Sequence, residues 1–229
     1  MKRIGLLGGM SWESSVLYEE LINTGVRERL GGTNSADLLI RSYNFAEIEA
    51  LQEAADWDRA GELLAADAKQ LEAAGAEVIA LCTNTMHRVS EAIEAAIDAE
   101  FIHICDAVGA AVKAEGLSTV GLLGTQFTME QPFYRERLES VGLDVVVPPE
   151  DERRLIHGII YNELVQGVLS RASQEEFLDV IDRLGLSGSE GVIAGCTEIE
   201  LLVSRDDVFV PYFPSTEIHA SAIVEASLT

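Results

Sequence analysis

Short apolar runs alternate along the chain with longer stretches in which apolar residues recur every three or four positions. The short runs are bounded by glycine, proline or polar residues, which is typical of parallel strands buried on both faces. The predicted strands are Arg3–Leu7, Asp37–Ser42, Val78–Cys82, Phe101–His103, Thr119–Leu123, Asp144–Val147, Gly191–Ala194 and Val208–Pro211.

The longer stretches have the amphipathic spacing of helices. Glycines stand where several of these helices should end, at positions 75, 116, 142 and 185. Strands that alternate with helices predict right-handed βαβ units and therefore parallel sheets of the α/β class. The predicted helices are Glu13–Leu30, Asp56–Ala74, Val89–Asp98, Asp106–Ala114, Gln131–Val141, Asp151–Gln166, Ser173–Leu184 and Ser215–Ser227.

Two segments of the first half return in the second half. The sequence VIALCTNT around Cys82 returns as VIAGCTEI around Cys196, 114 residues later. The opening segment IGLLGG at Ile4 returns as VGLLGT at Val120, 116 residues later. Two matches at nearly one offset predict two similar doubly wound parallel-sheet domains related by a pseudo-two-fold axis.

The repeat also predicts the domain boundaries. We expect residues 1–105 together with 215–229 to form the first domain and residues 106–214 to form the second. The final helix, after Pro214, has no counterpart in the repeat and is expected to pack back on the first domain. Such an arrangement would place Cys82 and Cys196 on opposite walls of one cleft.

Composition narrows the class of protein. A hydrophobic fraction of 48% supports a real core and excludes a disordered chain. No apolar run approaches the roughly 18 residues of a membrane span. The net charge of −23, with 39 acids against 16 bases, argues against nucleic acid and membrane partners. Because few of the bases are lysine, we favour adaptation to a salt-rich cytosol over ordinary acidic solubility.

The cysteines indicate a reducing compartment. Three cysteines without close spacing do not form a disulfide scaffold, so we expect a cytoplasmic protein. The four histidines are scattered and no CxxC motif occurs, so no metal site is expected. The start of the chain is interpreted as a first strand and not as a signal peptide.

Polar residues follow the predicted strands at the places where ligands bind. In open α/β sheets this is the edge beyond the carboxyl ends of the strands. Backbone N–H groups at helix starts attract anions, and hydroxyl or amide side chains add donors. We therefore expect a small anion held by neutral donors. The candidate donors are Ser11, Thr83, Asn84, Thr85, Thr125, Thr128 and Thr197.

Cys82 and Cys196 are the candidate reactive groups. A helix N-terminus can lower a thiol pKa from about 8.5 toward about 7, so one cysteine could be a thiolate and the other a thiol. Two opposed thiols can remove a proton from one face of a carbon and return one to the other. A lone buried cysteine is usually a core residue, which is our interpretation of Cys105.

Other candidate residues and motifs are weaker. Glu198 could assist proton transfer, bind a substrate ammonium, or simply favour the positive end of its helix. His87 is interpreted as an ordinary residue on a helix face. The G-x-G-x-x-G fingerprint is not satisfied, and no P-loop or G-x-S-x-G motif occurs, so the sequence argues against nucleotide binding and serine hydrolysis.

The motifs at these positions resemble the aspartate/glutamate racemase family from the first strand to the final helix. The chain is most similar to the branch of amino-acid racemases with MSWE near the start and NTMH after the first cysteine. The segments that carry the resemblance are IGLLGGMSWES at Ile4, CTNTMH at Cys82, GLLGT at Gly121 with Thr128-Met129, and GCTEI at Gly195.

The resemblance implies a cofactor-independent amino-acid racemase without pyridoxal phosphate or metal. It implies that Cys82 and Cys196 are the acid/base pair acting on a small amino-acid substrate, and that the protein is a homodimer. The residues expected to contact the substrate are Met10, Ser11, Thr83, Asn84, Thr85, Thr125, Thr128, Thr197 and Glu198.

The substrate stays open among aspartate, glutamate and a broader set. Aspartate-specific relatives hold the side-chain carboxylate with an arginine and a lysine, and the corresponding segments Asn44–Glu49 and Gly167–Ser170 contain neither. Two alternative functions also stay open. One is a related decarboxylase, cis–trans isomerase or hydantoin racemase, and the other is a non-catalytic protein that binds an acidic metabolite.

Overall fold

The computed structural model describes residues 1–229, which divide into two units. The first unit is Met1–His103 with His219–Thr229, and the second is Ile104–Ile218. The strands of the first unit are β1 (Ile4–Gly8), β2 (Leu38–Ser42), β3 (Val78–Leu81) and β4 (Glu100–Ile102). The strands of the second unit are β5 (Thr119–Gly124), β6 (Asp144–Val146), β7 (Gly191–Gly195) and β8 (Tyr212–Pro214).

Both sheets are parallel and have the same topology. The strand order is β2-β1-β3-β4 in the first sheet and β6-β5-β7-β8 in the second. In each sheet the chain therefore starts at an inner strand, moves to one edge, and crosses back to the other side. The predicted α/β class with two similar parallel-sheet halves is confirmed.

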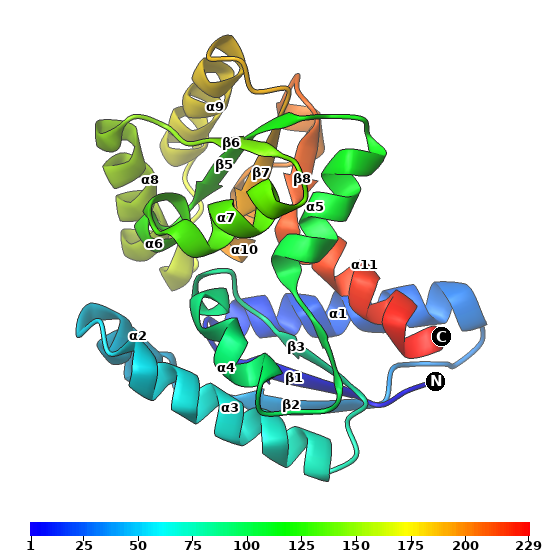
Figure 1. Ribbon diagram of the computed structural model, residues 1–229. Coiled ribbons are helices and arrows are strands. Elements are labelled where there is room, and N and C mark those ends of the chain that lie inside the picture. The colour runs from blue at the N-terminus through cyan, green and yellow to red at the C-terminus, as the bar shows by residue number, and fades with distance from the viewer. The chain divides into compact units, whose positions relative to one another are not determined.

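Helices connect the strands in both units (Figure 1). The helices before β5 are α1 (Trp12–Leu30), α2 (Phe45–Glu53), α3 (Trp57–Ala73), the 3₁₀ helix η1 (Thr85–Val89), α4 (Ser90–Glu94) and α5 (Ile104–Ala114). Those after β5 are α6 (Gln126–Glu130), α7 (Pro132–Ser140), α8 (Glu150–Asn162), η2 (Leu164–Gln166), α9 (Arg171–Leu186), α10 (Thr197–Leu202), η3 (Arg205–Asp207) and α11 (Ser215–Leu228).

Alternate side chains of each strand enter two separate cores. In the first unit, Ile4 and Leu6 pack with α1 and α11, whereas Leu7 packs with α2 and α3 on the other face (Figure 1). In the second unit, Leu122 packs with α5 and α7, whereas Leu123 packs with α8 and α9. Helices on both faces explain why the strands are continuous apolar runs instead of alternating ones.

Helix α11 belongs to both units, because its first residues lie in the second unit and the rest in the first. In the first unit, Val224 packs against Gly25 of α1. The Nε2–H of His219 donates to the carbonyl oxygen of Ile102 at 2.7 Å, so Nδ1 accepts from the Tyr18 hydroxyl at 2.8 Å. Burial lowers the pKa of His219 to about 4, which keeps the ring neutral at neutral pH.

The last predicted strand is wrong in position. Residues 208–211 are not a strand, and β8 is formed by Tyr212–Pro214. A capping box in which Ser204 and Asp207 bond each other's backbone starts the turn η3. Of the apolar residues that follow, Val208 and Val210 pack partly against the core of the second unit, whereas Phe209 faces outward. Phe209 is 99% exposed. The apolar run therefore predicts a strand where the chain is irregular and one large apolar side chain is exposed.

Several helix boundaries also differ from those predicted. The segment 151–166 is divided into α8 and η2, and the segment 89–98 contains a helix that ends at Glu94. Helix α2 lies outside the predicted helices; it has nine residues, and Asn44 at its N-cap makes no side-chain capping bond. Glycines 75, 116 and 142 end helices with positive φ as predicted, whereas Gly185 lies inside α9.

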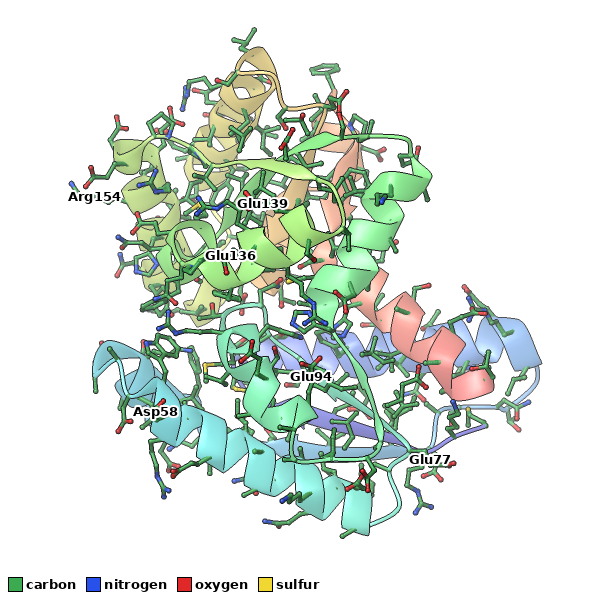
Figure 2. All side chains as sticks on the ribbon, in the orientation of Figure 1. Asp58, Glu77, Glu94, Glu136, Glu139 and Arg154 are labelled. Carbon is green, nitrogen blue, oxygen red and sulfur yellow. The ribbon has the colours of Figure 1, made fainter.

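Acidic side chains cover the surfaces of both units. Asp58 and Glu77 of the first unit and Glu136 and Glu139 of the second project into solvent (Figure 2). None of the helices combines the length and apolar character needed to cross a membrane.

Candidate active site

The loop after β1 is held by its neighbours on both sides. The backbone N–H of Tyr43, just after β2, donates to the carbonyl oxygen of Gly8 at 3.0 Å. Gly9 has φ +81°, and a Cβ placed there would lie 2.4 Å from the Tyr43 nitrogen, so only glycine fits. The N–H of Gly9 donates to Ser15 Oγ at 2.6 Å. The loop therefore has a fixed position at the carboxyl end of the sheet.

Cys82 directly follows β3 and is held on both sides by backbone hydrogen bonds. Its N–H donates to the carbonyl oxygen of Leu7 at 2.9 Å, and its carbonyl oxygen accepts from Ser14 Oγ at 3.1 Å. Ser14 lies in the first turn of α1, where its own N–H donates to the N-cap hydroxyl of Ser11 at 3.3 Å. The carboxyl end of β3 and the start of α1 are thus joined at this cysteine.

The segment after Cys82 turns back on itself around His87. The Nδ1–H of His87 donates to the carbonyl oxygen of Thr83 at 2.7 Å, and its backbone N–H donates to that of Asn84 at 3.1 Å. The ring packs against His103 and His219, with centroids 4.6 and 5.8 Å away. His87 of η1 is therefore a buried group that holds the turn, which its interpretation as an ordinary helix-face residue does not predict.

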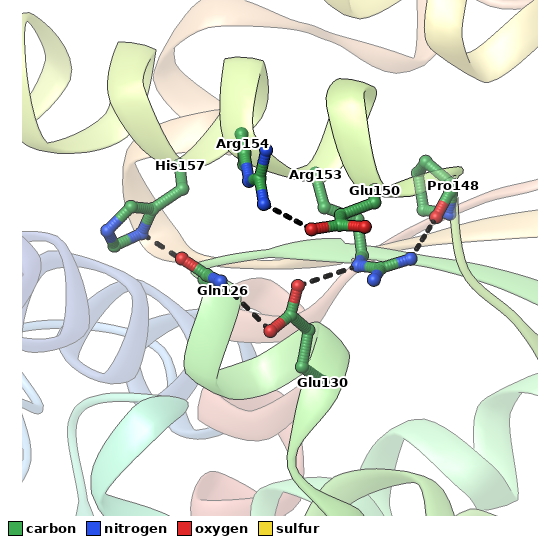
Figure 3. Close-up of polar contacts among 7 residues, drawn as sticks. All are labelled: Gln126, Glu130, Pro148, Glu150, Arg153, Arg154 and His157. Atoms are coloured by element: carbon green, nitrogen blue, oxygen red, sulfur yellow. Dashed lines mark hydrogen bonds and ion pairs between the residues drawn. The ribbon is translucent and has the colours of Figure 1, made fainter.

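The loop after β5 is the counterpart, in the second unit, of the loop after β1. Thr125 is the N-cap of α6, and its hydroxyl accepts from the N–H of Thr128 at 3.3 Å. The N–H of Gln126 donates to Nδ1 of His157 at 3.2 Å (Figure 3). Burial lowers the pKa of His157, which favours the neutral ring that can accept this bond. Helix α8 therefore holds the loop after β5 through His157.

A chain of polar contacts extends from this loop along α8. The side chain of Gln126 donates to Glu130, and Glu130 accepts from Nε of Arg153 at 2.9 Å (Figure 3). Arg153 also donates to the carbonyl oxygen of Pro148 at 2.7 Å. The Arg153 guanidinium helps to lower the pKa of Glu130. The guanidinium of Arg153 therefore bonds to other residues of the second unit.

Cys196 is the N-cap of α10 and is hydrogen-bonded to an acid. Its thiol donates to Oε2 of Glu198 at 3.0 Å, and both side chains are buried. Strands β5 and β7 end in Gly124 and Gly195, which allow the backbones of the two strands to approach each other closely. A Cβ at Gly195 would lie 2.8 Å from the carbonyl oxygen of Leu123, and one at Gly124 would lie 2.8 Å from that of Gly195.

The thiol pKa values are shifted in the direction opposite to the one predicted. Burial raises the pKa of Cys82 well above its ordinary value. Burial, followed by the negative charge of Glu198, raises that of Cys196. The helical elements that follow are short, a five-residue 3₁₀ turn and a six-residue helix, so they offset little of the desolvation. Both thiols are therefore held protonated at neutral pH.

The remaining candidate residues lie at the strand ends but differ in what their side chains do. Met10 packs in the core of the first unit, and Ser11 and Thr125 cap helices. Thr128 is fully buried, with its Oγ1 3.2 Å from that of Thr125. The other polar candidates are also buried at the ends of β3 and β7: Thr83, Asn84, Thr85 and Thr197.

Few of the residues that support these loops can be recognised from the sequence. Ser14 and Ser15 follow the cap Ser11 at helical spacing, which is a usable signal. His157 lies on an amphipathic helix 31 residues after Gln126, and nothing local marks it. Cys105 is buried in the core of the second unit, as predicted. No group of three or more His, Cys, Asp or Glu side chains is arranged to hold a metal ion.

Comparisons with known proteins agree with this architecture. The sequence matches the Asp/Glu/hydantoin racemase family over residues 7–223. A Yersinia pestis protein provisionally assigned as an Asp/Glu racemase is 47% identical with a TM-score of 0.94, and both chains are covered completely. An aspartate racemase homologue from Pyrococcus horikoshii is 36% identical with a TM-score of 0.87, again over both whole chains.

A broad-specificity amino-acid racemase from Bacillus subtilis is also similar, at 22% identity over 98% of each chain. The fold, with two parallel sheets that carry polar loops at their carboxyl ends, is that of the two-domain racemases. The chain belongs to the Asp/Glu/hydantoin racemase family. Family and fold together support an amino-acid racemase activity.

Proposed function

We propose that this protein is a cofactor-independent amino-acid racemase in which Cys82 and Cys196 are the two acid/base groups. The observation that carries the proposal is their equivalent position. Cys82 follows β3 and Cys196 follows β7, and these strands occupy the same place in two sheets of identical order. Each cysteine is buried and each is followed by threonine. A duplicated thiol at the ligand-binding edge suits a reaction with two proton transfers.

In the proposed reaction one cysteine removes the α-proton of the amino acid as a thiolate. The other, as a thiol, delivers a proton to the opposite face of the α-carbon, and the roles exchange for the opposite enantiomer. The balance is one proton taken and one returned, so no redox partner is required. Since both resting thiols are protonated, a local base must first deprotonate one of them.

Glu198 is the group placed to accept that proton from Cys196. Its carboxylate already accepts the thiol hydrogen bond, so transfer needs no movement of heavy atoms. The positive ammonium group of a bound amino acid would also favour the thiolate by Coulomb attraction. Exclusion of water by the substrate would make that attraction stronger.

Neutral donors would bind the α-carboxylate and stabilise the enediolate that forms when the α-proton leaves. We assign this role to backbone N–H groups and side chains of the loops after β1, β3, β5 and β7. Negative charge grows on the carboxylate in the transition state, so fixed donors lower the barrier as an oxyanion hole does. The proposed contact residues are Met10, Ser11, Thr83, Asn84, Thr85, Thr125, Thr128, Thr197 and Glu198.

The substrate proposal is aspartate, glutamate or a broader set of amino acids. Arg41, at the carboxyl end of β2, donates to Asp67 at 2.9 Å and stacks on Tyr43 at 4.3 Å. Arg88 stacks on Trp57 at 4.4 Å. These arginines are thus engaged with the protein itself, and a second substrate carboxylate would have to compete for them.

A racemisation screen over the amino acids, without added cofactor and in EDTA, tests the proposal. Chiral chromatography should show interconversion of at least one pair of enantiomers at constant mass. A product of changed mass would instead indicate a decarboxylase, and binding without turnover would indicate a metabolite-binding protein.

Because the reaction needs reduced thiols, we also propose a cytoplasmic location. From the resemblance to the family we propose a homodimer, which light scattering would test.

A further inference from the structure

Glu200 is a mostly buried acid that the proposed reaction does not use. It lies in α10, four residues after Cys196, and therefore one helical turn further along the same helix. Its Oε1 accepts the backbone N–H of Thr216 at 2.7 Å and the Ser215 hydroxyl at 3.4 Å. These are the first residues of α11, so the carboxyl group of Glu200 satisfies donors that a helix start leaves open.

No basic side chain compensates the charge of Glu200. On its own helix the titratable neighbours are Cys196 and Glu198, and from α7 and β8 they are Tyr134 and Tyr212. Arg205 of η3 is engaged elsewhere, with the carbonyl oxygen of Tyr212 and with Glu217.

One further thiol and two further acids lie next to these tyrosines or to their neighbours. The hydroxyl of Tyr134 is buried without a hydrogen-bond partner, and its pKa is raised by burial and, to a smaller extent, by Cys105 of α5. Asp106, the residue after Cys105, pairs with Arg137. Asp207 is bonded by Ser204. Burial raises the pKa of Glu200 to about 8 despite the bonds from α11, so Glu200 is mainly neutral at pH 7.

We propose that Glu200 is a positioning residue that holds the first turn of α11 and, through its charge, controls how readily Cys196 ionises. The charge of Glu200 acts on the Cys196 thiol in the same direction as that of Glu198. With Glu200 neutral, Glu200 adds no charge that opposes a thiolate at Cys196. With Glu200 ionised, the thiolate meets one more negative charge, and like charges disfavour each other's ionisation. The link to catalysis rests on the proposed function, whereas the contacts do not.

Alkylation of Cys196 tests the charge effect without requiring turnover. The full chain carrying Cys82→Ser and Cys105→Ser leaves one thiol, and its rate of labelling by iodoacetamide is measured from pH 7 to pH 10. In this background Glu200→Gln should shift the labelling curve to lower pH and speed labelling about threefold or more at pH 9, half a pKa unit or more. Glu217→Gln is the matched control, because Glu217 is an exposed neighbour of the same charge and should change little.

Identical curves for the Glu200→Gln variant and its parent would overturn the proposal. If the wild-type protein racemises an amino acid, ionisation of Glu200 should lower its kcat as the pH rises through about 8, and Glu200→Gln should remove that fall. If no amino acid is racemised while the labelling curve still shifts, the proposed function fails and the role of Glu200 in tuning the thiol stands.

Hydrogen exchange tests the hold on α11. Glutamine keeps an oxygen that can accept the Thr216 N–H, whereas alanine does not. Protection of the Thr216 amide should therefore survive in Glu200→Gln and fall in Glu200→Ala. Unchanged protection in the alanine variant would refute the positioning role, and if that variant does not fold, the glutamine variant still tests the charge effect.

Discussion

The thiol of Cys196 donates a hydrogen bond to the carboxylate of Glu198 at 3.0 Å, and Cys82 has no such partner. Burial is the cause that raises the pKa of Cys82, whereas burial and a carboxylate together raise that of Cys196. Two cysteines in equivalent positions of equivalent sheets therefore have different chemical surroundings. The difference predicts that the two directions of the proposed reaction respond differently to mutation of the acid.

Glu198→Gln should lower kcat by about 100-fold or more in the direction in which Cys196 takes the proton, the usual scale of a general base. KM should change much less. Initial rates with each pure enantiomer measure both parameters. Glu175→Gln, an exposed acid paired with Arg171, is the control and should leave both rates unchanged. A large rise in KM with kcat preserved would instead show that Glu198 binds the substrate ammonium.

Gly9→Ala should destabilise the protein far more than Gly116→Ala. Both glycines have positive φ, +81° and +76°, so both variants carry the backbone cost of about 1–2 kcal/mol. Only at Gly9 would the new methyl group meet the backbone of Tyr43, which adds about 1–3 kcal/mol of overpacking. Urea unfolding of the two variants and the wild type measures the difference, and equal losses would contradict the close contact at Gly9.

His219 should make the protein sensitive to acid. Its pKa is lowered to about 4 in the folded state, against 6.5 in the unfolded chain. Below pH 6.5 the unfolded chain therefore binds a proton that the folded protein does not, so stability falls as pH falls from 6.5 to 4. The loss is roughly 3 kcal/mol for a group shifted this far.

Urea unfolding at pH 7.0 and pH 4.5 measures that loss. His219→Gln keeps a side-chain N–H for the carbonyl oxygen of Ile102 but does not titrate, so it should lose less stability between the two pH values than the wild type does. His157→Gln is the comparison at a half-buried site, where the effect should be smaller. Parallel losses in wild type and His219→Gln would contradict the assignment.

Salt should stabilise the protein if its acidic surface is adapted to a salt-rich cytosol. The net charge is −23, and the Debye length falls from about 10 Å at 0.1 M to about 3 Å at 1 M salt, so repulsion among exposed acids weakens. Thermal melts in increasing KCl should show a rising Tm. Sucrose at matched osmolality separates charge screening from solute exclusion, and a Tm that KCl leaves unchanged would reject the adaptation.

The sequence predicts the sheets well because parallel strands covered by helices on both faces leave continuous apolar runs. It also predicts the equivalent cysteines, since the repeat around Cys82 and Cys196 is visible as letters. It fails at residues 208–211, where Phe209 is apolar but exposed and the strand β8 begins only at Tyr212, because composition does not say which apolar residue is covered. The domain boundaries stay a prediction that expression of the separate units would test.

The direction of the thiol pKa shifts cannot be predicted from the sequence, for a different reason. The raised pKa values come first from burial, which depends on side chains that folding brings together. Glu198, two residues after Cys196, is visible in the sequence, but its hydrogen bond with the thiol is not. Likewise His157 reaches Gln126 and Glu200 reaches Thr216 only through packing of distant segments. Contacts of this kind have no spacing rule along the chain.

Solvent isotope exchange with single-cysteine variants tests the central proposal most directly. Cys82→Ser and Cys196→Ser should each reduce racemisation to near zero and keep the fold. In deuterium oxide each variant should exchange the α-proton of one enantiomer only, and the two variants should act on opposite enantiomers, because one thiol remains on one face. Full racemisation by either variant, or exchange of both enantiomers by one of them, would contradict the two-cysteine mechanism.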